Sequence, residues 1–373
     1  MTPEDFRRNF PALESWTWLD TPGAPPGART VTTTLRRALD DWDSGSYDWL
    51  DWDRAADAAR YDFARWTGVS PESVASQTSL SEAATVAARC VPDGATTVVA
   101  ADEFRSVLFP AMEHAATTLS QIDLVQRRPG VSRTESLVEA IGPDTGLVMV
   151  SEVLTNDGEL VDIDAVCTAA HRHDGLVFAN LTQSLGVIRS DLSNHPADLV
   201  AAHGYKWMLC PRGTSWLVAD PARITIGPTV ASWKSAADPE QFFAGPYSHA
   251  VTASRFNSSP AWLSWIGARA ALELLAEIDT DASRSHVLHL ADRYINRMAG
   301  AGFRAINSGA RSHIVVAAPP DRKRIDPERL QEAGVRATIT ARGELRVGFH
   351  YFNTEADVDH AAASARSALV EHP

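Results

Sequence analysis

The chain of 373 residues is 45% hydrophobic and carries 34 basic against 47 acidic side chains, which gives a formal net charge of -13. A chain of this size buries a sizeable core, and typical domain sizes predict two or three lobes. Because no run of lysine or arginine offsets the acidic balance, the composition argues against nucleic acid as a partner. No apolar segment approaches the ~20 residues that cross a bilayer, and the first residues, MTPEDFRRNFPALE, lack the apolar core of a signal peptide, so we expect a cytoplasmic protein without a membrane partner.

The cysteines Cys90, Cys167 and Cys210 form an odd set in apolar neighbourhoods and lack CxxC spacing. This pattern indicates neither a disulfide framework nor a zinc site. We therefore expect three small core residues and no metal site.

The first part of the chain, to about Asp53, is rich in aromatic side chains. They are Trp16, Trp18, Trp42, Tyr47, Trp49 and Trp52. Interleaved with aspartates, as in DWDSGSYDWLDWD, they can line a cleft for a bulky polar ligand such as a sugar. The alternative is that they anchor an N-terminal arm against the body of the protein or against a partner subunit, since large aromatic side chains mostly supply burial.

A break at the proline- and glycine-rich residues 22–27 precedes a helical segment that begins near Val31. From Arg54 onward, helix-like and strand-like segments alternate, which is typical of a mainly parallel sheet with crossover helices. The predicted helices are 54–66, 104–118 and one with Ile163, Val166, Cys167 and Ala170 on its apolar face, and the predicted strands are 96–101, 146–153, 176–181 and 198–203. Ligands of such sheets bind beyond the carboxyl ends of the strands, so the residues that follow each strand are the first candidates for a site.

Beyond Ser254 the pattern changes to long helices followed by short strands. The predicted elements are helices 262–278 and 282–298, strands 312–318, 337–341 and 345–350, and a last helix opened by Thr354 and Asp357. We predict an N-terminal arm of residues 1–15, a large α/β domain of residues 16–255 and a small α+β domain of residues 256–373.

Two neighbouring predicted strands end in polar side chains. Asn180 and Gln183 stand at the end of the first, and Lys206 follows the second between two aromatic residues. A lysine at the end of a strand is usually solvated, but one that forms a Schiff base must be held near a group that tunes its cofactor. The spacing suits one of the two amide side chains reaching a pyridine nitrogen, so we predict that Lys206 carries pyridoxal 5′-phosphate (PLP).

The surrounding motifs support this prediction by resemblance. They are Asn180-Leu-Thr-Gln183-Ser-Leu-Gly186 and His203-Gly-Tyr-Lys206-Trp-Met-Leu-Cys-Pro-Arg-Gly213. In order and spacing they resemble the signature of the class V aminotransferase family of fold-type I PLP enzymes, which includes cysteine desulfurases, kynureninase, isopenicillin epimerase-like proteins and carbon–sulfur lyases. The resemblance covers nearly the whole chain. It implies the fold-type I α/β architecture, with a mainly parallel sheet in the large domain, and a homodimer with shared active sites.

The resemblance also implies roles for single residues. Lys206 would form the Schiff base, Gln183 would contact the region of the ring hydroxyl, and His203 and Tyr205 would lie near the phosphate. The stretch Ser79-Leu80-Ser81, before a helix starting near Glu82, looks like the phosphate-binding turn, since a helix N-terminus suits a dianion. A simple capping box or ST-turn is the alternative.

Four more residues occupy positions where the family has functional groups. Phe104, in Glu103-Phe104-Arg105-Ser106, is the candidate for stacking on the PLP face, although a core phenylalanine would look the same. Thr155 sits where relatives have a polar contact to the ring oxygen. Ser259 lies in a segment that resembles the one crossing to the neighbouring subunit's phosphate. Arg346 interrupts an apolar strand, and its guanidinium fork matches an α-carboxylate, with a structural ion pair as the competing account.

Two departures from the family pattern bear on the reaction. Residues 335–343, where a cysteine desulfurase has its nucleophile, contain no cysteine, which argues against persulfide chemistry. Asn180 replaces the aspartate that pairs with the pyridine nitrogen, and a neutral amide does little to keep that nitrogen protonated.

We therefore predict a PLP-dependent lyase that cleaves the C–S bond of a bulky S-substituted cysteine by β-elimination, in secondary metabolism. Arg346 would hold the carboxylate of the substrate, and Lys206 would act as general base. The alternatives are a decarboxylating oxidative deaminase that uses dioxygen, an aminotransferase or epimerase, and a PLP-fold binding protein without activity.

Overall fold

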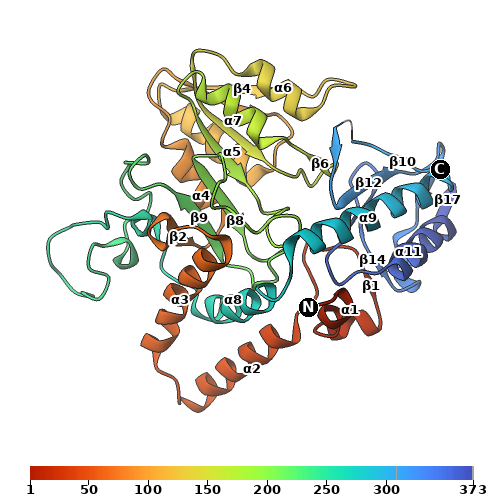
Figure 1. Cartoon of the computed structure of the whole chain (residues 1–373), viewed down its shortest axis with the longest axis horizontal. Helices are drawn as coiled ribbons and strands as arrows, with labels where there is room; N and C mark the ends of the chain where they lie inside the picture. The colour runs from red at the N-terminus through yellow and green to blue at the C-terminus, as the bar shows by residue number, and fades with distance from the viewer. Residues whose placement is uncertain (308, 372–373) are drawn as a thin grey trace.

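The computed structural model describes residues 1–307 and 309–371 and is built around a seven-stranded sheet (Figure 1). Its strands are β2 (Val74–Gln77), β3 (Thr96–Ala100), β4 (Gln121–Val125), β5 (Thr145–Ser151), β7 (Leu176–Asn180), β8 (Leu199–His203) and β9 (Ser215–Ala219). They lie in the order β2-β9-β8-β7-β5-β3-β4. Strand β9 is antiparallel to both of its neighbours, whereas the pairs from β8 to β4 are parallel, so the mainly parallel sheet is confirmed.

Helices cover both faces of this sheet because the buried strands are apolar on both sides. They are α2 (Arg29–Ser44), α3 (Trp49–Thr67), α4 (Leu80–Ala88), α5 (Arg105–Thr117), α6 (Arg133–Ala140), α7 (Ile163–His171) and α8 (Trp262–Leu275). Leu147 and Phe178 pack with α4 and α5 on one face, and Val148 and Val177 pack with α3, α6, α7 and α8 on the other. This alternation follows from the period-2 geometry of a strand.

Most elements match the sequence-based predictions, and the differences lie at their ends. Helix α3 begins at Trp49 rather than at Arg54, because Asp48 is its N-cap and accepts from the N–H of Leu50. Helix α4 begins at Leu80 rather than near Glu82. After α7, Asp174 takes the left-handed conformation, with φ of 58°.

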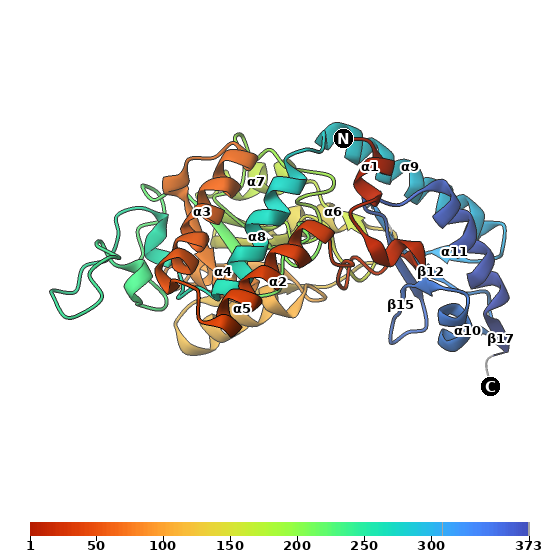
Figure 2. The ribbon, with the colours of Figure 1, turned by 90° about the horizontal axis from the view of Figure 1, so that it is seen from below.

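The C-terminal part forms a second, smaller sheet of four antiparallel strands beside two long helices (Figures 1 and 2). The sheet order is β10 (Arg304–Ala305), β12 (Ile314–Ala318), β16 (Leu345–Gly348) and β15 (Thr338–Ile339), and the helices are α9 (Thr280–Ala299) and α11 (Glu355–Ser367). Thr354 and Asp357 form the predicted capping box of α11. Smaller elements are β13 (Lys323–Ile325), α10 (Pro327–Glu332), β17 (Leu369–Glu371) and the 3-10 turns Pro11–Glu14, Pro71–Ser73, Trp233–Ser235 and Ala253–Phe256.

The N-terminal residues pack against the C-terminal part. Helix α1 (Pro3–Arg7) brings Phe6 into stacking contact with His350, at 5.5 Å between ring centroids, and β1 (Thr17–Trp18) pairs with β14 (Val335–Arg336). Figure 2 shows α1 lying beside α9 and α11. The division of the chain at residues 255 and 256 stays a prediction.

A short ladder connects the two sheets near the cavity described below. Strand β6 (Glu159–Leu160) pairs with β11 (Ala310–Arg311), directly after the left-handed Gly158. A Cβ at Gly158 would lie 2.0 Å from the carbonyl oxygen of Ile314, so only glycine fits this approach of the chain to β12.

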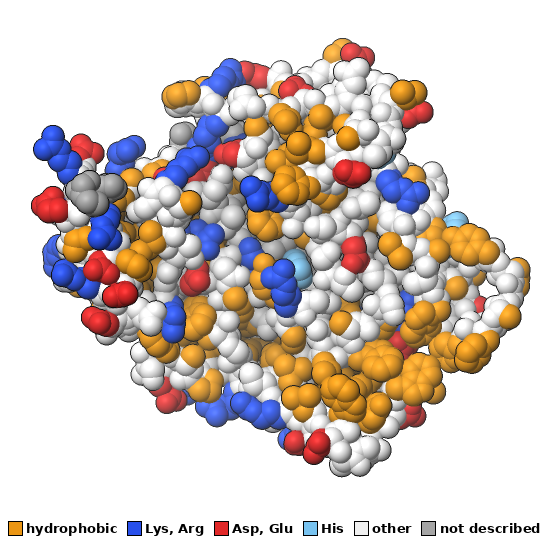
Figure 3. All heavy atoms as spheres, turned by 180° about the vertical axis from the view of Figure 1, so that it is seen from behind, with side chains coloured by type: hydrophobic (Ala, Val, Ile, Leu, Met, Phe, Trp, Pro, Cys, Tyr) orange, Lys and Arg blue, Asp and Glu red, His pale blue; other side chains and the backbone are white. Residues whose placement is uncertain are grey.

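Aromatic side chains of the N-terminal segment gather on the surface. Figure 3 shows hydrophobic atoms concentrated over α2 and α3 on the back of the molecule. This aromatic patch comprises Trp42, Tyr47, Trp49, Trp52, Phe242 and Trp262, which contact one another edge-on or stacked. Trp42 is 55% exposed. None of these side chains lines the cavity around Lys206.

Among the residues that the structure describes, no helix combines the length and apolar character of a membrane span. The same residues contain no group of three or more His, Cys, Asp or Glu placed to hold a metal ion.

Candidate active site

A cavity lies beyond the carboxyl ends of three neighbouring strands of the large sheet. Ser151 ends β5, Asn180 ends β7 and His203 ends β8. The cavity is lined by Leu80, Phe104, Ser151, Val153, Leu154, Thr155, Asn180, Thr182, Gln183, His203, Tyr205 and Lys206. Parallel strands direct their ends to one edge of the sheet, which explains why residues far apart in sequence meet here.

Lys206 is buried in this cavity, with 6% of its surface exposed. Its Nζ lies 5.6 Å from the centroid of the Phe104 ring and 5.7 Å from that of Tyr205. Burial lowers the pKa of Lys206 to about 7, and the cationic Arg346 acts in the same direction, whereas Asp20 raises it. Near neutral pH much of the amine is therefore unprotonated and can act as a nucleophile or base.

Asn180 is held by protein atoms at both ends of its amide. Its Nδ2 donates to Ser151 Oγ at 2.8 Å, and its Oδ1 accepts from the backbone N–H of Thr182 at 3.0 Å. The side chain is 3% exposed and faces the cavity, so a ring nitrogen at this edge of the sheet would meet an amide and not a carboxylate.

Gln183 is also engaged by the protein. Its Oε1 accepts from the indole of Trp207 at 2.7 Å, and its Nε2 donates to the carbonyl of Pro22 at 3.2 Å. The amide keeps one N–H for a ligand. Gln183 thereby ties the residue after Lys206 to the N-terminal segment.

His203 and Tyr205 form one wall of the cavity, with their ring centroids 4.5 Å apart. Burial lowers the pKa of His203 to about 4, so the imidazole is neutral at physiological pH. Its Nε2 is buried and has no hydrogen-bonding partner among the described residues. A buried nitrogen without a partner is the kind of group that a polar ligand satisfies.

The turn before α4 is a capped helix start. Ser79 is the N-cap and its Oγ accepts from the N–H of Glu82 at 3.4 Å. The carboxylate of Glu82 in turn accepts from the N–H of Thr78 at 3.1 Å and from the Ser258 hydroxyl. Capping is thus present, and of the three residues of this turn Leu80 lines the cavity, whereas Ser79 and Ser81 do not. Ser259 is exposed and does not line the cavity.

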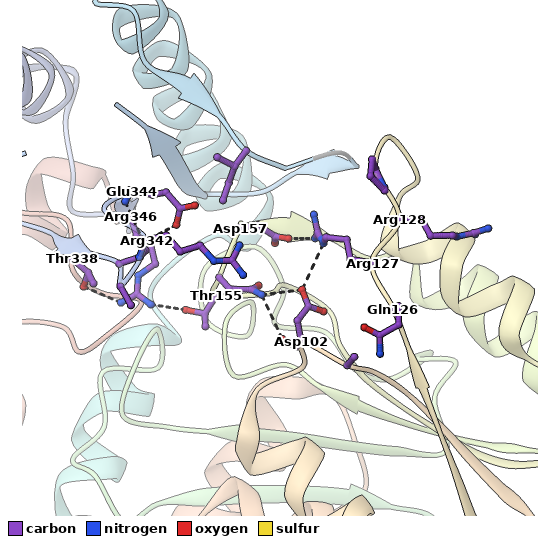
Figure 4. Close-up of a pocket in the computed structure, with 16 residues that line it drawn as sticks. Asp102, Gln126, Arg127, Arg128, Thr155, Asp157, Thr338, Arg342, Glu344 and Arg346 are labelled. Atoms are coloured by element: carbon purple, nitrogen blue, oxygen red, sulfur yellow. Dashed lines mark hydrogen bonds and ion pairs between the residues drawn. The ribbon is translucent and has the colours of Figure 1, made fainter. Parts of the chain in front are cut away.

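Arg346 lines a larger cavity of about 860 Å³ between the two sheets, and Thr155 lines both this cavity and the one around Lys206 (Figure 4). Its Nη1 donates to Thr155 Oγ1 and its Nη2 to Thr338 Oγ1, both at 3.0 Å. Asp20 lies 3.4 Å from Nη2. The arginine therefore has a loose ion pair and also lines the larger cavity, and the Thr155 hydroxyl, which lines both cavities, accepts from it.

Sequence reasoning missed several residues of the site. Glu103 follows the predicted strand 96–101 and could have been found by its position after a strand. Ser151 lies inside the predicted strand 146–153, and it becomes the last residue of the strand only because β5 ends two residues earlier than predicted. Asp20 comes from a segment remote in sequence and carries no local signal of its contact with Arg346. Thr338 lies opposite Arg346 on the neighbouring antiparallel strand β15, so its contact depends on the strand register.

The arrangement fits PLP. A PLP-dependent enzyme needs a lysine that can form a Schiff base and groups that hold and tune the cofactor. The site offers a buried amine of lowered pKa, an aromatic ring beside it, a polar group at the end of the adjacent strand and a histidine nitrogen without a partner among the described residues.

Comparison with known proteins gives the family. The model of the aminotransferase class-V family matches residues 50–360. An uncharacterized aminotransferase, YcbU, of Bacillus subtilis (strain 168) is 30% identical over 375 residues, which cover 96% of this chain and 96% of YcbU.

Solved structures agree on the fold. The cysteine desulfurase CsdA of Escherichia coli matches with a TM-score of 0.83 at 18% identity, over 99% of this chain and 98% of that one. The cystine C-S lyase C-DES, in complex with its reaction product cysteine persulfide, matches with a TM-score of 0.82 at 18% identity, over 96% and 99%. The chain belongs to the class V aminotransferase family, has the fold-type I architecture and is an enzyme whose cofactor is PLP.

Proposed function

We propose that the protein is a PLP-dependent lyase that cleaves the C–S bond of a bulky S-substituted cysteine by β-elimination, in secondary metabolism. The observation that carries the proposal is Asn180, a neutral amide at the end of β7. When bound, PLP draws electrons from Cα of the substrate, and a ring without a carboxylate partner holds them less firmly, which favours their departure with a leaving group on Cβ.

Arg346 binds the α-carboxylate in this proposal. Its two terminal nitrogens form a fork that matches the two oxygens of a carboxylate. The substrate would take over the bonds that Thr155 and Thr338 now accept, and Asp20 would separate from the guanidinium. The adjoining cavity of about 860 Å³ has room for a large substituent on sulfur.

Lys206 moves the proton. Its amine, freed by the substrate, removes the proton from Cα as general base, and a pKa near 7 suits that role because catalytic bases work best near the operating pH. Phe104 would cover one face of the cofactor ring. The N-terminal amides of α4, from Ser79 to Ser81, and the neutral His203 beside Tyr205 would hold its phosphate.

The cysteines of the chain do not support desulfurase chemistry. None lines either of the two cavities among the described residues. Burial raises the pKa of Cys90 to about 11 and that of Cys167 to about 12 and also raises the pKa of Cys210, so all three are poor nucleophiles. Elimination, which requires no protein thiol, suits the site better.

The aromatic patch supports a homodimer. A contiguous apolar surface of this kind marks an interface more often than a free surface. We propose that it meets a second copy of the chain, with Ser259 near the partner's phosphate site, and that the aromatic residues therefore anchor a subunit contact and do not bind a sugar.

The proposal is tested with purified protein and a panel of S-substituted cysteines. The lyase should release pyruvate, ammonia and a thiol at equal rates with and without oxygen. Lys206→Ala should abolish both the reaction and the visible absorbance of bound PLP, whereas Lys323→Ala, at a half-buried lysine on β13 that lines neither cavity, should change neither. Carbon dioxide that forms only in air would instead indicate the oxidative deaminase and refute the lyase.

Transamination is the second candidate, because YcbU is described as an aminotransferase. It would convert the amino acid to its keto acid and leave the C–S bond intact. Mass spectrometry of the products separates the two reactions.

A further inference from the structure

A chain of buried hydrogen bonds runs from Asn180 through Ser151, which also lines the cavity, to Glu103, which does not. Ser151 Oγ, which accepts from Asn180, lies 2.7 Å from Glu103 Oε1. Glu103 also accepts from the N–H of Ser151 at 2.9 Å and from the N–H of Phe104 at 2.6 Å. Asn180, Ser151 and Glu103 are 3%, 2% and 4% exposed. The reaction proposed above assigns no role to Glu103.

Both ends of this chain favour one orientation of the Asn180 amide. A backbone N–H can only donate, so the N–H of Thr182 requires Oδ1 on its side and places Nδ2 against Ser151. A serine hydroxyl has one hydrogen, and the carboxylate of Glu103 takes it, which leaves Ser151 Oγ to accept from the amide. A rotated amide would set two N–H groups against each other at Thr182 and compete with Glu103 for the Ser151 hydrogen.

The second N–H of the Asn180 amide determines whether a ring nitrogen beside it can carry a proton. Asn180 has two N–H bonds, and Ser151 uses one of them. The other is available to a ligand in the cavity that Asn180 lines. A nitrogen that receives this hydrogen bond must offer a lone pair, so it cannot carry a proton.

The neighbouring positive charges also disfavour a proton on the ring nitrogen. Arg346 and Arg212 both disfavour a positive charge on Lys206, and a proton on a ring nitrogen in the same cavity would add another. Burial raises the pKa of the Glu103 carboxyl, whereas the hydrogen bonds that it accepts from Ser151 and Phe104 act in the opposite direction.

We propose that Glu103 is a positioning residue that, through Ser151, fixes the Asn180 amide with an N–H toward the pyridine nitrogen of PLP and so keeps that nitrogen unprotonated. This inference rests on the proposed function in placing Asn180 at the ring nitrogen. It does not depend on which bond of the substrate breaks.

The experiment is nitrogen NMR of the protein reconstituted with PLP labelled with ¹⁵N in the ring, without substrate. The wild type should show the chemical shift of an unprotonated pyridine, and Asn180→Asp should move it to that of the protonated form. Glu103→Gln should move or broaden the ring signal and the side-chain amide signals of Asn180, because its NH₂ group opposes backbone N–H donors. Glu113→Gln, an exposed glutamate on α5, is the matched control and should change nothing.

Ser151→Ala covers the case in which Glu103→Gln does not fold, since it removes the hydroxyl and keeps the backbone bond to Glu103. It should also alter the amide signals of Asn180, and Ser151→Thr should restore them. A protonated ring nitrogen in the wild type overturns the inference, as do unchanged Asn180 and ring signals in the folded Glu103→Gln or Ser151→Ala protein. An unprotonated ring in a protein that releases no thiol would refute the lyase proposal and leave this inference standing.

Discussion

Arg346 offers the sharpest test of how the site binds its substrate. We expect Arg346→Gln to impair the reaction of α-amino acids because it removes the fork that would hold their carboxylate. The two terminal nitrogens each have one hydrogen bond at 3.0 Å that a carboxylate would take over. Each bond to a charged group contributes ~1.5–3 kcal/mol. At ~1.4 kcal/mol per factor of ten, losing both should lower kcat/KM by ~10²–10⁴-fold.

The assay compares each amino acid with the amine that lacks its carboxylate. The wild type should discriminate between them by a similar ~10²–10⁴-fold. Arg346→Gln should lose this discrimination, because it lowers kcat/KM for the amino acid but changes kcat/KM for the amine by less than about threefold. Arg342→Gln, at an exposed arginine that lines the same larger cavity, is the matched control and should keep it. A loss of equal size for the amine and the amino acid would refute the carboxylate role and favour the structural ion pair.

Three further predictions test the cavity, the fold and the assembly. Protein freed of PLP should take up the cofactor faster as pH rises through about 7, where Lys206 loses its proton. Arg346→Gln should move the midpoint of this pH dependence to higher pH, because it removes a cation that lowers the pKa of Lys206. Stopped-flow absorbance measures the uptake rate in both proteins. Gly158→Ala should lower the free energy of unfolding by ~3 kcal/mol or more, because it adds backbone strain and a clash with β12. Gly94→Ala, at a left-handed glycine with open space around it, should lower it by only ~1–2 kcal/mol. Denaturant titration measures both losses, and equal losses would contradict the clash. Trp42→Asp, in the aromatic patch, should convert the proposed dimer to a monomer in light scattering. An unchanged dimer mass would exclude this surface as the contact.

The sequence alone was sufficient for the class of fold and for the cofactor. Strands such as 176–181 are apolar because they are buried on both faces, and this burial is visible as composition. The lysine and its flanking residues are local in sequence, so their pattern indicated PLP before any contact was known. Helix ends were less accurate, since the cap of α3 at Asp48 lies outside the periodic pattern on which the prediction relied.

The tertiary structure decided how the site residues are held. Asp20 meets Arg346, and Ser151 orients Asn180, because segments that are separate in the sequence come together in the folded chain. The direction of a hydrogen bond depends on both partners, so a local sequence pattern around Asn180 cannot predict which atom of its amide faces the cavity. The sequence by itself determined which chemical groups are present, while only folding determined which of them face the cofactor and with which atom.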